Sequence, residues 1–214
     1  MTQLIVALDT ELERAKAIVD ELGAEVGFYK VGYKLFLRHG IDILSFLRER
    51  NKKIFLDLKF YDIPNTMANA AKECADLGID MFNIHVAAGR EAVDAMLKAM
   101  PEDRPFLIGV TVLTSRDAKA GEVESLAESA KEWGLDGVVC SVGEARAIKE
   151  RVGNDFLCVC PGVRLNKEGV DDQRRVYTPI EARDAGADFI VVGRPIVMAQ
   201  LPLDIARRIN SELN

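Results

Sequence analysis

Short apolar segments recur along the chain and alternate with stretches whose apolar positions follow a helical period. Eight of these segments have the length of buried β-strands: Leu4 to Leu8, Val26 to Val31, Ile54 to Leu58, Met81 to Val86, Phe106 to Val112, Gly137 to Cys140, Phe156 to Cys160 and Phe189 to Val192. Each is nearly continuously apolar, as expected of strands that are covered on both faces. Helices between the strands make the sheet parallel, so the pattern predicts eight βα units.

Capping and breaking residues mark the ends of several predicted helices. Thr10 is expected to cap the first helix, which Gly23 ends. Pro64 suits the first turn of the helix after the third strand, because proline there lacks an N–H that would be unpaired anyway. Thr178 and Pro179 give the same start signal to the helix before the last strand.

The length and the strand count predict one α/β domain that spans residues 1–214. Eight βα units in 214 residues fit a compact (β/α)8 TIM barrel with few insertions. An open, doubly wound sheet is the alternative architecture. No linker or low-complexity block divides the chain, and the stretch of weakest periodicity, Gly162 to Val176, is a candidate lid.

Composition and charge indicate which kinds of partner the protein is expected not to bind. The formal net charge of −6 disfavours binding to nucleic acid or to an acidic membrane surface. No apolar run approaches the roughly 18 residues that cross a bilayer and no basic-apolar leader is seen, so we expect a cytoplasmic protein. The four cysteines lack zinc-ligand spacing and are expected to be reduced core thiols, and we expect no metal site.

The end of the third predicted strand carries the densest group of charged residues. Asp57 and Lys59 are two positions apart, so they point to the same side, toward the barrel mouth if Leu58 faces the helices. In a βα barrel this end of the strands forms the active site. A surface ion pair is the alternative, but the adjoining sequence from Asp62 to Thr66, in register with a helix start, favours a functional role. Carboxylates beside Lys59 favour its ammonium form, which suits an acid rather than a Schiff-base nucleophile.

A second group of residues suits a small anion. Phosphate sites in such barrels are often built from the loops after strands seven and eight. The chain offers Pro161 to Arg164 after the seventh strand and Gly193 to Ile196 after the eighth. Glycine allows close approach of the backbone, and the planar fork of Arg194 suits phosphate. Ordinary structural turns are the alternative for either segment alone.

These motifs together resemble the orotidine 5′-monophosphate decarboxylase family. The likeness is carried by Asp57-x-Lys59-x-x-Asp62-Ile63-Pro64-Asn65-Thr66, with support from Ala7-Leu8-Asp9, Lys30-Val31-Gly32, Thr111 to Ser115, Pro161 to Arg164, Asp172-Gln173 and Val192 to Ile196. The resemblance implies a cofactor-independent decarboxylation of orotidine 5′-monophosphate to uridine 5′-monophosphate, the last step of de novo synthesis of that nucleotide. It departs from the usual family pattern at Tyr61, Cys160 and Leu165.

The resemblance also implies roles for the charged residues at the strand ends. Asp9 and Lys30 are expected to hold the ribose hydroxyls and to join a charged network with Asp57. Lys59 is expected to stabilise the carbanion at pyrimidine C6 and to protonate it. Preorganised charge in a water-poor site is usually the largest catalytic effect, so we rank it above destabilisation of the substrate carboxylate by Asp57.

The remaining implied roles concern the rest of the nucleotide and a second subunit. Thr114 is expected to meet the base, and Gln173 to bridge base and phosphate. The phosphate ligands are expected to be Arg164, Gly193 and Arg194. Asp62 and Thr66 are expected to reach the neighbouring subunit's site, which makes the protein a homodimer with shared active sites.

Two rival functions fit parts of the same pattern. A metal-dependent sister enzyme of the 3-keto-gulonate 6-phosphate decarboxylase or hexulose phosphate synthase type shares Asp-x-Lys-x-x-Asp, and Asp9, Asp57 and Asp62 could supply oxygen ligands to a hard cation. The segment from Ile63 to Thr66 favours the nucleotide enzyme. A noncatalytic nucleotide-binding barrel is disfavoured because Lys59 and both carboxylates are present.

Overall fold

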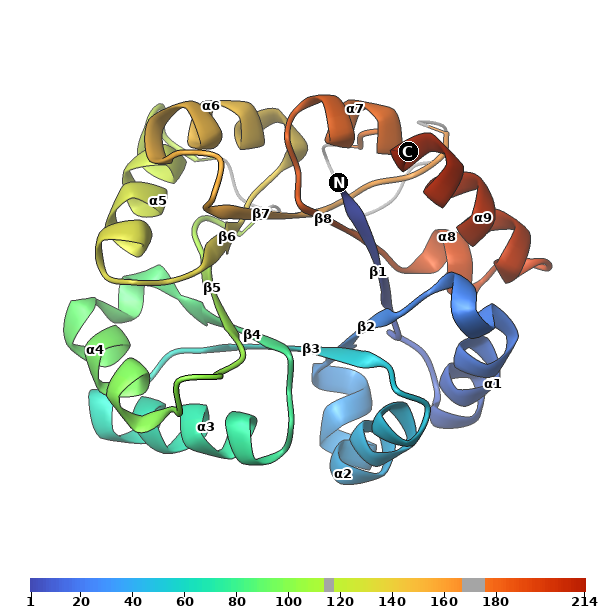
Figure 1. Ribbon diagram of the computed structural model, residues 1–214, viewed down its shortest axis with the longest axis horizontal. Helices are drawn as coiled ribbons and strands as arrows, with labels where there is room; N and C mark the ends of the chain where they lie inside the picture. The colour runs from blue at the N-terminus through green and yellow to red at the C-terminus, as the bar shows by residue number, and fades with distance from the viewer. Residues whose placement is uncertain (114–117, 167–175) are drawn as a thin grey trace.

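The eight strands close into a parallel barrel in chain order, as Figure 1 shows in a view down the barrel. This computed structural model describes residues 1–113, 118–166 and 176–214. The strands are β1 (Gln3–Ala7), β2 (Phe28–Gly32), β3 (Lys53–Phe60), β4 (Met81–His85), β5 (Phe106–Val110), β6 (Gly137–Val139), β7 (Leu157–Pro161) and β8 (Phe189–Val192). The predicted (β/α)8 fold is confirmed, and the open doubly wound sheet is excluded because β1 pairs with β8.

Helices surround the barrel and cover the outer face of every strand (Figure 1). The α-helices are α1 (Leu12–Leu22), α2 (Tyr33–Glu49), α3 (Pro64–Asp76), α4 (Arg90–Ala99), α5 (Glu122–Glu132), α6 (Val142–Val152), α7 (Pro179–Asp184), α8 (Arg194–Val197) and α9 (Pro202–Leu213). Two short 3-10 helices, η1 (Gly23–Glu25) and η2 (Val86–Ala88), follow α1 and β4. None of the helices in the described ranges is long and apolar enough to cross a membrane.

Two apolar layers hold the barrel together, one on each side of its wall. Ile5 and Phe55 belong to a small cluster inside the barrel, whereas Leu4 and Leu56 belong to the large cluster between strands and helices. Successive side chains of a strand point to opposite faces, so odd positions of β1 and β3 face the interior. Phe55 is therefore followed on the inner face by Asp57 and Lys59.

The predicted element boundaries are mostly confirmed to within two residues. The third strand runs beyond its predicted end and includes Lys59. Pro64 opens α3 as expected, and Thr178 caps α7 through a hydrogen bond from the Glu181 backbone N–H. The prediction for Thr10 was wrong: Glu11 occupies the cap position of α1 and makes no side-chain cap. The four cysteines are free and buried, as predicted.

Candidate active site

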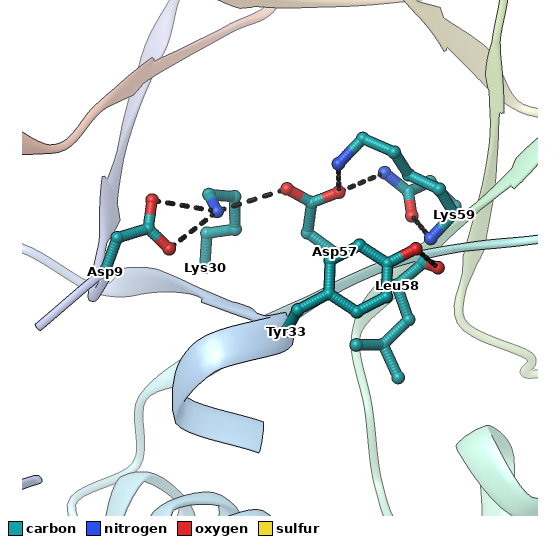
Figure 2. Close-up of polar contacts among 7 residues, drawn as sticks. Asp9, Lys30, Tyr33, Asp57, Leu58 and Lys59 are labelled. Atoms are coloured by element: carbon teal, nitrogen blue, oxygen red, sulfur yellow. Dashed lines mark hydrogen bonds and ion pairs between the residues drawn. The ribbon is translucent and has the colours of Figure 1, made fainter. Parts of the chain in front are cut away.

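Four charged side chains from three neighbouring strand ends form a chain of ion pairs at the carboxyl end of the barrel. The Lys30 ammonium lies between two carboxylates, 3.1 Å from Asp9 Oδ1 and 3.1 Å from Asp57 Oδ2. The other oxygen of Asp57 accepts from Lys59 Nζ at 2.5 Å. Figure 2 shows this alternation of acid and base across the site. The structure thus brings together Asp9, Lys30, Asp57 and Lys59, four of the predicted site residues.

The ion pairs fix the charge state of the two most buried members. Burial opposes the charged form of Lys30, but the carboxylates of Asp57 and Asp9 outweigh burial and raise its pKa. Burial likewise opposes charge on Asp57, but Lys30, Lys59 and Asn83 outweigh it and lower the pKa of Asp57. Lys30 is therefore held as an ammonium and Asp57 as a carboxylate at neutral pH.

The missing side chain of Gly32 makes room for this network. A Cβ at that position would lie 3.0 Å from Asp9 Oδ1 and 3.1 Å from Lys30 Nζ. Both distances are shorter than an ordinary contact with a carbon atom, so a side chain at this position would force the Asp9 carboxylate and the Lys30 ammonium to shift. Glycine at the end of β2 is therefore part of the construction of the site.

The backbone at Lys59 leaves the regular strand conformation. Its φ is 46°, in the left-handed region that side chains other than glycine seldom adopt. The β3–β4 pairing shifts between Leu56 and Phe60, so a bulge interrupts pairing with β4 at Asp57 and Lys59, although Asp57 still pairs with Gly32 of β2. Such bulges often occur beside active sites, where they redirect a side chain. Here the bulge ends in a lysine that is one-quarter exposed.

Two further polar residues contact the bulge. The amide oxygen of buried Asn83 accepts from the Lys59 backbone N–H at 2.7 Å, and its amide nitrogen donates to Asp57 Oδ1 at 2.7 Å. The hydroxyl of Tyr33 donates to the carbonyl of Leu58, and the Tyr33 ring centroid lies 5.9 Å from Lys59 Nζ (Figure 2). Both residues therefore hold the segment that carries Asp57 and Lys59.

A pocket opens above the charged network. Its volume is about 390 Å³, within the range of small-molecule sites. One side is apolar, with Val110, Val112 and Leu113, and the floor carries the ion pairs. The loops after β7 and β8 form another side. They contribute the three predicted phosphate ligands, Arg164, Gly193 and Arg194.

Two predicted site residues do not line this pocket in the described structure, and two others lie outside the described residues. Asp62 and Thr66 are exposed and are absent from its lining, and Asp62 Oδ1 accepts from the backbone N–H of Ile63. Thr114 and Gln173 lie outside the described residues, as does most of the Gly162 to Val176 stretch. The two ends of that stretch are joined by a β-bridge between Val163 and Tyr177.

Asn83 and Tyr33 were missed by reasoning from the sequence. Asn83 interrupts the apolar run of β4 at an inward position, as Met81 of the same strand belongs to the inner cluster. A buried amide in such a place needs hydrogen-bond partners, and that signal could have identified it. Nothing in the sequence singles out Tyr33, because its partner is a backbone carbonyl that only the fold brings near.

Comparisons with known proteins agree with the geometry. A model of the orotidine 5′-phosphate decarboxylase / HUMPS family matches residues 2–209. Two curated relatives are named orotidine 5′-phosphate decarboxylase. The protein from Nostoc sp. is 43% identical, and the alignment covers 99% of this chain and 97% of the relative. The protein from Tolumonas auensis is 41% identical, and the alignment covers 99% of this chain and 98% of the relative. A solved structure of orotidine 5′-phosphate decarboxylase from Lactobacillus acidophilus is 37% identical, with a TM-score of 0.86 and full coverage of both chains. This chain therefore belongs to the orotidine 5′-phosphate decarboxylase / HUMPS family.

Proposed function

We propose that this chain decarboxylates orotidine 5′-monophosphate to uridine 5′-monophosphate, and that Lys59 stabilises and protonates the carbanion. The activity is the one in the names of relatives about 40% identical over nearly the whole chain. The observation that carries the mechanism is the Lys59 ammonium, held 2.5 Å from the Asp57 carboxylate beneath the pocket. We place the reaction in the cytoplasm, where nucleotide precursors are made.

The reaction needs a positive charge fixed in advance near C6. The bond between C6 and the carboxylate carbon breaks, CO₂ leaves, and the electron pair stays on C6 in the plane of the ring. No π-system accepts that pair, so the Lys59 ammonium stabilises it and then transfers a proton to C6. Lys59 regains its proton from solvent. A charge held by Asp57 does not have to reorient during the reaction, which is the source of its catalytic value.

No cofactor takes part in the proposed mechanism, because the chain's own charges perform each step. Lys30 holds Asp57 in place on the side away from Lys59, and Asp57 would face the substrate carboxylate. Repulsion between the two carboxylates would raise the energy of the bound substrate, but this effect is contested and we rank it second.

Two groups of pocket residues suit the rest of the nucleotide. Asp9 and Lys30 line the pocket and supply the acceptor and donor that ribose hydroxyls need. Arg164, Gly193 and Arg194 line it on the loops after β7 and β8, where phosphate binds in many barrels, and β8 lies beside β1. We infer that the phosphate binds there and that the pyrimidine ring lies over Lys59.

We also propose that two copies associate through the surface beside β3. Large apolar side chains gather on α2 and on the segment before α3: Leu37, Ile41, Tyr61 and Ile63 are all more than half exposed. Asp62 and Thr66 flank the same segment, are exposed and are absent from the lining of their own pocket. A second copy would cover the apolar surface and receive Asp62 and Thr66 into its site, in a two-fold arrangement.

The test is the absorbance change of orotidine 5′-monophosphate with purified protein and a chelator present. Turnover that survives the chelator supports the proposal. Turnover that is abolished by the chelator and restored by a divalent metal would favour the metal-dependent sister activity. Binding of the nucleotide without turnover would favour a noncatalytic protein.

A further inference from the structure

We propose that Asn83 and Tyr33 form a brace that positions Lys59 for the reaction, without either residue reacting with the substrate. The inference deepens the proposed function, because it concerns the residue to which that function assigns the chemistry. Lys59 lies at a bulge, where the strand ladder no longer fixes its backbone. Something else must therefore hold the lysine in place.

Asn83 holds the bulge from the β4 side. It is 1% exposed, and both ends of its amide are used. Its oxygen takes the Lys59 N–H that the bulge leaves without a ladder partner, and its nitrogen orients Asp57 Oδ1, the oxygen that contacts Lys59 Nζ. One side chain thus fixes the backbone of Lys59 and the counter-ion of its ammonium together.

Tyr33 holds the bulge from the opposite side, at the start of α2. Its hydroxyl donates to the carbonyl of Leu58, the residue that precedes Lys59. Its ring lies close enough to Lys59 Nζ for a cation–π attraction. Figure 2 shows the Tyr33 ring beneath the segment that joins Asp57 to Lys59.

The unusual backbone of Lys59 explains why two contacts are needed. A residue other than glycine in the left-handed region has a strained backbone, which persists only when its surroundings enforce it. Both hydrogen bonds act on the single peptide group between Leu58 and Lys59: its carbonyl accepts from Tyr33, and its N–H donates to Asn83 on the opposite side. Loss of either contact would let the backbone relax and would move the ammonium away from the place where C6 lies.

The variants for the test separate the contacts. Tyr33→Phe removes only the hydroxyl and keeps the ring, at a partly exposed position where the fold should tolerate the change. Asn83→Leu removes both amide contacts with little change in volume. Ile84→Val is the matched control: it lies next to Asn83 on β4 but faces the outer apolar layer. The double variant Tyr33→Phe/Asn83→Leu measures whether the two residues act through the same segment.

The measurements are kcat and KM for orotidine 5′-monophosphate, the affinity for uridine 5′-monophosphate, the melting temperature and the oligomeric state. From the strength of neutral and charge-assisted hydrogen bonds, we expect kcat to fall about 5-fold in Tyr33→Phe and about 50-fold in Asn83→Leu. Affinity for the product should change less than about 2-fold, because a positioning residue does not bind the nucleotide. The double variant should lose less than the product of the single losses, and Ile84→Val should resemble the wild type.

Several results would overturn the brace. One is a kcat within 2-fold of the wild type in both single variants. Another is an equal loss of kcat and of product affinity in Asn83→Leu, which would make Asn83 a substrate ligand. Crystal structures of the variants give a readout independent of turnover. The brace predicts that Lys59 Nζ moves away from Asp57, and an unmoved Lys59 would refute it. If the wild type itself has no turnover, the proposed function fails, and the crystal structures still decide on the brace.

Discussion

The two ends of the barrel use the same residue types, aspartate and lysine, for different purposes. At the amino end, three aspartates stand directly before β4, β6 and β8, and each accepts the backbone N–H at the start of the preceding strand. The bonds are Ile54 N–H to Asp80 at 2.8 Å, Leu107 N–H to Asp136 at 2.7 Å and Cys158 N–H to Asp188 at 2.7 Å. At the carboxyl end, Asp57 accepts from lysine and asparagine side chains instead.

Lysine shows the same contrast. Lys149 on α6 is buried near the amino end, and its ammonium donates to the carbonyls of Asn154 and Phe156 and to Asp188. Its three donors are matched by three acceptors, so it has none left for a ligand. Lys59 has Asp57 as its ion-pair partner and borders a pocket. A buried charge saturated by the backbone stabilises the fold, whereas one that keeps donors toward a cavity is suited to chemistry.

The substitution Lys59→Ala tests this contrast, and we expect its effect on turnover to be the largest of those considered. Removal of the only proposed proton donor should lower kcat at least about 1,000-fold, the upper range for loss of one preorganised group. The melting temperature should stay near that of the wild type, because Asp57 keeps Lys30 and Asn83 as partners. Turnover within 10-fold of the wild type would remove Lys59 from the mechanism.

Lys149→Met should have the opposite outcome. It leaves Asp188 and two carbonyls without their buried partner, so we expect a loss of about 3 kcal/mol in the free energy of unfolding. The kcat of the folded fraction should be unchanged, since Lys149 lies at the other end of the barrel. Urea unfolding and steady-state kinetics on the same preparation would check both statements. A stable Lys149→Met protein with impaired kcat would contradict the contrast.

Sequence patterns predicted one end of the barrel better than the other. Strand parity placed Asp57 and Lys59 on the inner face, because alternation depends only on neighbouring residues. The structural aspartates were not recognised, although Asp80, Asp136 and Asp188 each follow a glycine and one apolar residue. Their partners lie 26 to 30 residues away, and only the closed barrel determines which N–H each one meets.

The bulge at Lys59 could not be predicted for a similar reason. Asp57-Leu58-Lys59 has the pattern of a regular strand, whereas the φ of 46° at Lys59 occurs beside contacts with Asn83 and Tyr33, which belong to other elements. The dimer and the roles of Asp62 and Thr66 stay predictions, because one chain cannot complete a shared site. The Thr10 cap failed because helix α1 begins one residue later than the pattern indicated.

A substitution at the pocket rim after β8 should lower turnover less than Lys59→Ala does. Arg194→Ala removes a charge-assisted contact to phosphate, so we expect kcat/KM for the nucleotide to fall about 50-fold. Turnover of orotidine, which lacks the phosphate, should be slow and equal in the wild type and the variant. Measurement of both substrates with both proteins gives the comparison. An Arg194→Ala loss that is the same for nucleoside and nucleotide would show that Arg194 does not bind phosphate.

The smallest expected effect is the pH dependence of the stability that Asp57 contributes. Its pKa is lowered below the ordinary 3.8, because Lys30, Lys59 and Asn83 together outweigh burial. A carboxyl whose pKa is lowered on folding contributes stability that is fully present above its ordinary pKa and is lost as pH falls through the folded value. We therefore expect the wild type to have a higher free energy of unfolding than Asp57→Asn. This difference should be constant from about pH 7 to 5 and should shrink below about pH 4. Urea titrations at several pH values measure this difference. A difference that grows on acidification would mean that the lysines do not hold Asp57 in its charged form.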